Sequence, residues 1–190
     1  GLPLSAAGLQ GIAVGIGPGS FTGVRMGVAV AKALAHALHL PLVGVSAPEA
    51  MATALGVPPD HTVCVLQGAR GNEVYMTPLI IGPDRLAHEV GPTQALRLAK
   101  ALKVAQQVLG RPPDHVCGDV AQENCGTIRD LFESTRVAHD RCSLPRASDL
   151  AIIGEARLAQ ADPDAPFSLR PRYVQLSQAE REHGLDLELS

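Results

Sequence analysis

The feature that most constrains the fold is an apolar run that meets a turn of Gly, Pro and Ser and then a long helical stretch. Residues 12–16 form the run, G-P-G-S forms the turn, and residues 21–40 favour one helix that ends before Pro41. Leu42–Val45 is a second apolar run, after which Ser46 is expected to cap a helix over residues 48–55. Strand, helix and strand within about 35 residues are typical of a βαβ unit, which predicts an α/β fold with parallel strands.

The pattern starts again after the breaker sequence G-V-P-P-D at residues 56–60. Apolar alternation then predicts a hairpin of residues 62–67 and 73–81 and a strand at residues 115–118. Helical periodicity predicts an amphipathic helix over residues 93–109 and a helix over residues 148–161. A further helix is predicted to begin with a capping box at Thr127.

Composition excludes several classes of protein. The 190 residues are 46% hydrophobic and 18% charged, which is enough apolar material for a sizeable core. The net charge of -3 argues against a broad nucleic-acid surface. No apolar run has the ~18 residues that a membrane helix needs, and no signal peptide is evident. The four cysteines contain no C-x-x-C pair, so we expect no metal site, reduced thiols and a cytoplasmic protein.

The glycine turn has two phosphate-binding interpretations, and it departs from both motifs. A P-loop has Lys after its second conserved Gly, but Val24 follows Gly23 here, and a dinucleotide fingerprint has Gly where this chain has Ser20. Free N–H groups between a strand and a helix still attract anions. The turn is therefore expected to be structural, with anion binding as the alternative, and its residues are Gly17, Pro18, Gly19, Ser20, Thr22, Gly23 and Arg25.

Ser20 also invites comparison with a serine nucleophile. A nucleophile elbow is G-x-S-x-G, whereas Pro18 and Thr22 occupy the glycine positions around Ser20. No motif places a histidine as its base. We therefore expect Ser20 or Thr22 to cap the following helix, a role worth ~1 kcal/mol.

The helix after the turn has an unusually narrow polar side. Arg25, Lys32, His36 and His39 fall within about 60° of one another at 100° per residue. The rest of the surface is small or apolar, which predicts burial on more than one side, with another chain as the second partner. The expected partner or dimer interface comprises Phe21, Val24, Met26, Gly27, Val28, Val30, Ala31, Leu34 and Ala35. His36 and His39 have no carboxylate or thiol nearby in sequence, so we expect a solvated stripe rather than a metal site.

The second candidate site is the hairpin turn A-R-G-N-E at residues 69–73. Arg70 and Glu73 are candidates to face a ligand. An ion pair between them, worth ~0–1 kcal/mol, is the alternative.

These motifs resemble those of a known family. Residues 15–27 read G-I-G-P-G-S-F-T-G-V-R-M-G, residues 40–46 read L-P-L-V-G-V-S, residues 69–75 read A-R-G-N-E-V-Y and residues 171–175 read P-R-Y-V-Q. Together they resemble the TsaB (YeaZ) family, non-catalytic subunits of the bacterial system that makes threonylcarbamoyladenosine in tRNA, within the glycoprotease-like superfamily.

The resemblance implies an actin-like ATPase fold with two ribonuclease H-like lobes and no cofactor. It implies binding to the homologous catalytic subunit TsaD and the ATPase TsaE, a homodimer when alone, and only indirect contact with tRNA. The departures are Gly68, where the family has Asp, and Gln175, where it has Arg. Family chains begin with a strand, a hairpin and a helix that are not found here, so the first lobe is expected to be truncated at its N-terminus. We expect residues 1–57 and 166–190 in the first lobe and residues 58–165 in the second.

Three functions from different classes therefore compete. The leading hypothesis is a scaffold or dimerisation subunit without catalysis of its own. The alternatives are a glycoprotease-like hydrolase, which rests on Ser20, and a nucleotide-binding module, which rests on analogy with the actin-like fold.

Overall fold

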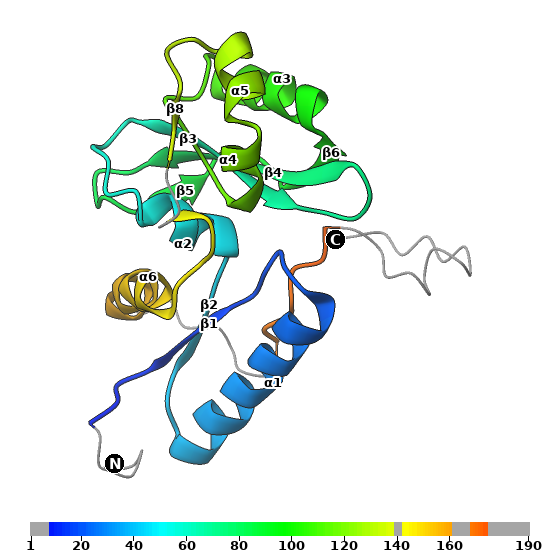
Figure 1. The fold of residues 1–190 in the computed structure, drawn as a ribbon. Helices are drawn as coiled ribbons and strands as arrows, with labels where there is room; N and C mark the ends of the chain where they lie inside the picture. Colours follow the sequence, from blue (N-terminus) through cyan, green and yellow to red (C-terminus); the bar gives the residue numbers. More distant parts are fainter. Residues whose placement is uncertain (1–7, 139–141, 161–167, 175–190) are drawn as a thin grey trace.

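The protein consists of two α/β lobes, each with its own sheet (Figure 1). The computed structural model describes residues 8–138, 142–160 and 168–174. The strand order is β1-β2 in one sheet and β5-β4-β3-β7-β8 in the other, where β6 also pairs with β4. This arrangement is the actin-like, ribonuclease H-like two-lobe fold that the resemblance implies.

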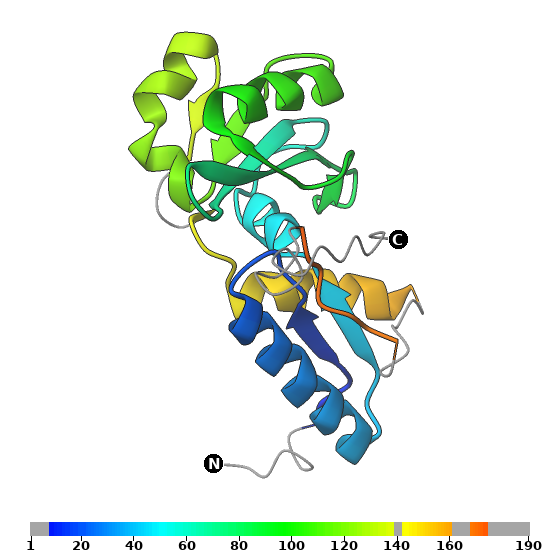
Figure 2. The ribbon, with the colours of Figure 1, turned by 90° about the vertical axis from the view of Figure 1, so that its right-hand side faces the viewer.

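The first lobe is a parallel strand pair between two helices. β1 (Ile12–Gly15) pairs with β2 (Leu42–Val45), and α1 (Phe21–Leu38) connects them. Ile12, Val14 and Leu42 pack against α1. The alternate residues of β1 face the opposite way, toward α6 (Ala147–Ala159). Figure 2 shows β1 and β2 lying between these two helices.

The second lobe is a mixed sheet. Its strands are β3 (Thr62–Gly68), β4 (Glu73–Ile81), β5 (Ala87–Glu89), β6 (Gln94–Arg97), β7 (His115–Cys117) and β8 (Arg136–Val137). One face is covered by α3 (Leu98–Leu109), α4 (Asp119–Glu123) and α5 (Cys125–Leu131). The other face packs on α2 (Ala47–Thr53), which therefore lies between the two sheets (Figure 1).

The βαβ unit and the hairpin are confirmed nearly to the residue. β1, α1 and β2 occupy the expected ranges, except that α1 ends at Leu38, where His39 adopts a left-handed conformation with φ of 52°. β3 and β4 pair antiparallel from Thr62 opposite Ile80 to Gly68 opposite Val74. The predicted helices over residues 48–55 and 148–161 are α2 and α6.

Two local predictions are wrong. The helix expected over residues 93–109 begins only at Leu98, because Gln94–Arg97 extends the sheet by pairing with Glu73–Met76 of β4. Backbone hydrogen bonding along β4 thus overrides the helical periodicity of this segment. The capping box at Thr127 is also wrong, since α5 already begins at Cys125 and has no side-chain cap.

The placement of α6 bears on how the chain divides into lobes. The sequence led us to expect this helix in the second lobe, within residues 58–165. It instead packs on both strands of the first sheet, where Gly154 lies so close to Ala13 that an added Cβ would fall 2.5 Å from its Cβ. We therefore propose a division in which residues 62–138 form the second lobe and α6 belongs with the first.

Candidate interaction surface

The turn between β1 and α1 is held from several directions. Ser20 caps α1 by accepting a hydrogen bond from the Gly23 N–H at 3.4 Å, so the cap is Ser20 and not Thr22. Gly17 has φ of 95°, and a Cβ on it would lie 3.3 Å from the Arg172 carbonyl oxygen, which explains why glycine is needed here. Its own carbonyl accepts from the Ala47 N–H at 2.9 Å. The turn thereby anchors α1 to the start of α2.

Gln67 connects this turn to the second lobe. Its Nε2 donates to the Pro18 carbonyl at 3.5 Å, while its Oε1 is buried without a protein partner among the described residues. An unsatisfied buried acceptor of this kind is commonly met by an ordered water. The glycine turn therefore has a clear structural role, and anion binding by its N–H groups stays a prediction.

Arg25 does not face the turn. Its Nε donates to the Tyr173 hydroxyl at 2.7 Å, and its guanidinium lies 4.0 Å from the centroid of the Phe21 ring. Phe21 and Tyr173 are themselves in contact, with ring centroids 5.2 Å apart. Arg25 therefore ties the start of α1 to the segment of residues 168–174.

One side of α1 belongs to the protein's own core. Val28, Ala31 and Ala35 are 3%, 7% and 2% exposed and pack with Leu42 and Leu169. The sequence placed these three residues in the partner interface, and that assignment needs correction, because they already cover the first sheet. Val24, from the same list, is partly buried against this cluster.

A second side of α1 is apolar and exposed. Met26 is 63% exposed and Val30 57%, and a Cβ added to Gly27 would meet no atom within 4 Å. We call this surface the α1 outer face; it comprises Gly23, Met26, Gly27, Val30, Ala33, Leu34 and Ala37, all of them exposed. It carries no charged side chain, since the basic residues of α1 lie elsewhere on the helix. Contiguous exposed apolar residues of this kind are typical of a protein–protein contact.

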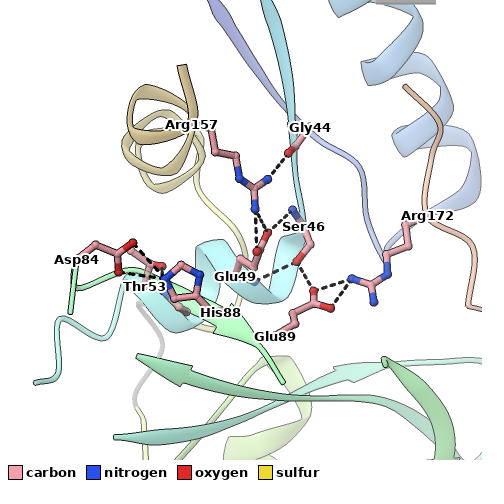
Figure 3. Close-up of polar contacts among 10 residues, drawn as sticks. Gly44, Ser46, Glu49, Thr53, Asp84, His88, Glu89, Arg157 and Arg172 are labelled. Atoms are coloured by element: carbon pink, nitrogen blue, oxygen red, sulfur yellow. Dashed lines mark hydrogen bonds and ion pairs between the residues drawn. The ribbon is translucent and has the colours of Figure 1, made fainter. Parts of the chain in front are cut away.

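A polar cluster joins the two lobes beside α2 (Figure 3). Glu89 at the end of β5 accepts two hydrogen bonds from Arg172 Nη1, both at 2.6 Å, and one from the Ser46 hydroxyl at 2.6 Å. Ser46 also caps α2, because its Oγ accepts from the Glu49 N–H at 3.3 Å while Glu49 Oε2 accepts from the Ser46 N–H at 3.1 Å. A capping box in the first lobe thus supports an ion pair with the second.

Arg157 of α6 completes the cluster from the other side. Its Nη2 donates to both carboxylate oxygens of Glu49, at 2.8 and 3.0 Å, and its Nη1 donates to the Gly44 carbonyl. Beside it, a pocket of about 170 Å³ lies between α6 and the β4–β5 turn, with Asp84 and His88 in its lining. This volume is below the ~300 Å³ at which small-molecule sites begin, so the pocket does not suit a nucleotide.

The hairpin turn gives no defined site. Arg70 is exposed at its tip, and Glu73 begins β4, where its carbonyl accepts from the Ala69 N–H at 3.2 Å. Gly68 donates its N–H to Asp119 Oδ1 at 3.0 Å, and a Cβ there would lie 3.4 Å from Asp119 Oδ2. An Asp at position 68, as the family motif has it, would bring a second carboxylate beside Asp119. A ligand role for Arg70 and Glu73 stays a prediction.

Several titratable side chains of the second lobe are buried or partly buried. Burial raises the pKa of the Cys64 thiol to about 12 and raises that of Cys117, so neither is a thiolate near neutral pH. His61 Nδ1 and His115 Nε2 lie 3.1 Å apart, and burial together with the charge of His61 lowers the pKa of His115. Within residues 8–138, 142–160 and 168–174, no three His, Cys, Asp or Glu residues are grouped to hold a metal ion.

The two-lobe fold and this uncharged helical surface define a class: an actin-like protein with an exposed apolar helix surface. Comparison with known proteins defines the family within this class. A family model described as TsaD, tRNA N6-adenosine threonylcarbamoyltransferase, matches residues 2–182. The tRNA threonylcarbamoyladenosine biosynthesis protein TsaB of Bacillus subtilis is 35% identical over 177 residues, which are 90% of this chain and 72% of that protein. The protein of the same name from Escherichia coli is 50% identical over 42 residues, 22% of this chain and 18% of that protein.

Solved structures agree on the fold. A Pseudomonas aeruginosa protein described as similar to peptidase YEAZ has a TM-score of 0.70 at 24% identity, covering 92% of this chain and 76% of that one. YeaZ from Pseudomonas aeruginosa has a TM-score of 0.63 at 22% identity, covering 90% and 76%. The chain belongs to the TsaB (YeaZ) family of the glycoprotease-like superfamily.

Proposed function

We propose that this chain is a non-catalytic docking subunit in the synthesis of threonylcarbamoyladenosine in tRNA. The family ties the chain to this pathway, because its curated relatives carry the pathway in their names. The finer proposal is that the chain binds and stabilises the homologous catalytic subunit, TsaD, and joins the ATPase TsaE in one complex.

The observation that carries the proposal is the α1 outer face. It is exposed, apolar and uncharged, while the opposite side of the same helix is packed in the core. Full burial of an exposed Met, Val or Leu side chain contributes about 1.5–3 kcal/mol, and Met26, Val30 and Leu34, which are 63%, 57% and 38% exposed, would each supply a part of that against a partner. The same face would join two copies when the catalytic subunit is absent.

Contact with tRNA would be indirect, through the complex, and we propose a cytoplasmic location. No helix among the described residues is long and apolar enough to cross a membrane.

Among the residues that the structure describes, two alternatives lack a supporting observation. A hydrolase would need an activated nucleophile, but the Ser20 hydroxyl serves as a helix cap. A nucleotide module would need a larger site than the pocket beside Arg157.

The test compares two charged substitutions on one helix. Val30→Glu adds a charge to the α1 outer face, and Ala29→Glu adds the same charge at an exposed position about 100° away around the helix. Binding to a purified catalytic homologue would be measured by calorimetry, with circular dichroism as the check on folding. We expect Val30→Glu to weaken binding at least about a hundredfold, since it leaves a carboxylate in an apolar contact, and Ala29→Glu to bind within about threefold of the wild type. Equal binding by both variants would refute the proposal.

A further inference from the structure

Arg25 is held in one position while part of its guanidinium stays available. Its Nε donates to the Tyr173 hydroxyl at 2.7 Å, and the guanidinium lies 4.0 Å from the centroid of the Phe21 ring. Among the described residues, its two terminal nitrogens, Nη1 and Nη2, have no hydrogen-bond partner. A guanidinium that is already oriented loses little conformational entropy when it binds a phosphate group through two parallel N–H bonds.

Two further cations lie close to Arg25 in the first lobe. Lys32 follows it by seven residues, which places the two within about 20° of each other around α1 and about 10 Å apart along it. Within the part of the chain that the structure describes, neither has an ion-pair partner. Arg170 is exposed and follows Leu169, which packs with the buried side of α1. We call Arg25, Lys32 and Arg170 the basic flank.

This side of the molecule has no acidic side chain in its sequence. Residues 1–48 and 168–174 contain no Asp or Glu, although the whole chain has 19 of them and a net charge of -3. The first acid, Glu49, is bonded to Arg157 of α6, which lies on the opposite face of the first sheet from α1 (Figure 2). Glu89 of the second lobe is bonded to Arg172. The basic flank therefore keeps its positive charge and attracts a polyanion.

An exposed aromatic ring lies at one end of the basic flank. Phe21 is 37% exposed, and its ring centroid lies 5.2 Å from that of Tyr173. Bases of a single-stranded nucleic acid stack on exposed rings of this kind, and cations beside the rings follow the backbone. An acidic peptide has no bases to stack. The combination of an acid-free row of cations with an exposed ring therefore favours a nucleic acid over an acidic protein segment.

We propose that the basic flank binds the backbone of single-stranded RNA directly, with a base against Phe21. The inference goes beyond the proposed function, which gives this chain only an indirect contact with tRNA. It also moves the anion site from the glycine turn, where the sequence placed Arg25, to the side of α1. Val30, at the centre of the α1 outer face, lies about 140° from Arg25 around the helix, so RNA and a protein partner can be bound together.

The binding is measured by fluorescence anisotropy of a labelled oligouridine of about 12 nucleotides, within the usual range of site sizes. We expect a dissociation constant of about 10⁻⁴–10⁻⁶ M, as for other electrostatic contacts with nucleic acids. The slope of log K against log[salt] should be about -2, because three cations meet about three phosphates of a single strand. Since the contacts are to the backbone, oligoadenosine should bind with an affinity similar to that of oligouridine.

Two variants separate the charge of the flank from its geometry. Lys32→Gln removes one cation, so binding at ~50 mM salt should weaken about five- to tenfold and the slope should become shallower by ~0.7. Arg25→Lys keeps the charge but cannot form two parallel bonds to a phosphate, so binding should weaken at least about threefold with an unchanged slope. The matched control is Lys103→Gln, which removes an exposed cation of α3 in the second lobe and should stay within about twofold of the wild type, since salt screens distant charges.

Circular dichroism checks that each variant is folded. No binding at ~100 μM wild-type protein, the weak end of the expected range, would overturn the inference. So would equal effects of Lys32→Gln and Lys103→Gln, or polyglutamate that competes as well as an oligouridine of the same charge. Loss of RNA binding leaves the binding of the catalytic homologue intact in this scheme, and Val30→Glu tests that contact separately.

Discussion

Glu89 and Arg172 come from different lobes and meet in an ion pair in which one guanidinium nitrogen contacts both carboxylate oxygens. Both carboxylate oxygens of Glu89 lie 2.6 Å from Arg172 Nη1, and the two side chains are 17% and 31% exposed. The Arg172 N–H also donates to the Ile16 carbonyl at 2.7 Å. Arg172 thus connects β5 of the second lobe with the end of β1 in the first.

Removing Arg172 should loosen this connection. Among the described residues, Arg172→Ala leaves Glu89 with the Ser46 hydroxyl as its hydrogen-bond partner, so we expect the free energy of unfolding to fall by about 1–3 kcal/mol. Urea denaturation measures the change. In a double-mutant cycle with Glu89→Gln the effects should be non-additive by at least ~0.5 kcal/mol, and strict additivity would show that the pair contributes nothing.

Ser46→Ala should lower stability more than the loss of one hydroxyl group usually does. It removes both the cap of α2 and a hydrogen bond to Glu89, so a loss of about 1–2 kcal/mol is expected. Ser46→Thr, which keeps the hydroxyl, is the control and should recover most of the loss. Thermal unfolding of the three proteins decides, and identical midpoints would contradict the cap's role.

Two neighbouring positions on α1 should behave oppositely. Val28→Glu buries a charge among Ala31, Ala35 and Leu42 and should cost more than about 3 kcal/mol or prevent folding. Val30→Glu lies on the exposed side and should change stability by less than about 0.5 kcal/mol. Denaturation midpoints test the contrast, and an unfolded Val30→Glu protein would show that the helix faces are assigned wrongly.

Stability should fall as the pH falls below neutral. Burial and the nearby charge of His61 lower the pKa of His115, with Asp114 acting in the opposite direction and Arg136 in the same one. Below pH ~6.5 the unfolded chain therefore binds more protons than the folded protein. The contribution of His115 to the free energy of unfolding is at its maximum above that pH and declines below it.

The His115→Gln variant is the control for this pH dependence, because it cannot titrate. We expect its stability to be flatter between pH ~7 and ~5, the range of an ordinary histidine. Protonation of Asp114 lowers the stability in a separate, more acidic pH range. Burial raises the pKa of Asp114, but the hydrogen bonds from Thr62 and the charge of Arg111 have the larger effect, so its pKa lies below the ordinary value. Equal slopes for wild type and variant would remove His115 as the cause.

Sequence periodicity was enough to predict the βαβ unit and the hairpin, because each depends on contacts within one short segment. It failed at Gln94–Arg97, where three- and four-residue spacing continues through a strand and only the pairing with β4 decides the conformation. On α1 the periodicity identified two apolar sides but could not show which of them packs in the protein's own core. Val28, Ala31 and Ala35 were therefore assigned to a partner interface.

The polar cluster could not be foreseen. Arg157 and Glu49 are 108 residues apart in sequence, and Arg172 and Glu89 are 83 apart. None of these four side chains belongs to a motif that signals its partner. Ser46 is the one member of the cluster that the sequence indicated, because a helix cap is a local feature.

The position of α6 has a consequence for synthesis. The second lobe is contiguous, from β3 to β8, so all its strands can pair as soon as residue 138 has left the ribosome. The first lobe receives α6 and Leu169 only after that whole insertion has been translated, although β1 and α1 emerge early. The contacts that α6 and Leu169 make with this lobe therefore join residues far apart in sequence, and the nascent chain must carry a half-covered strand pair while its later-made lobe folds first.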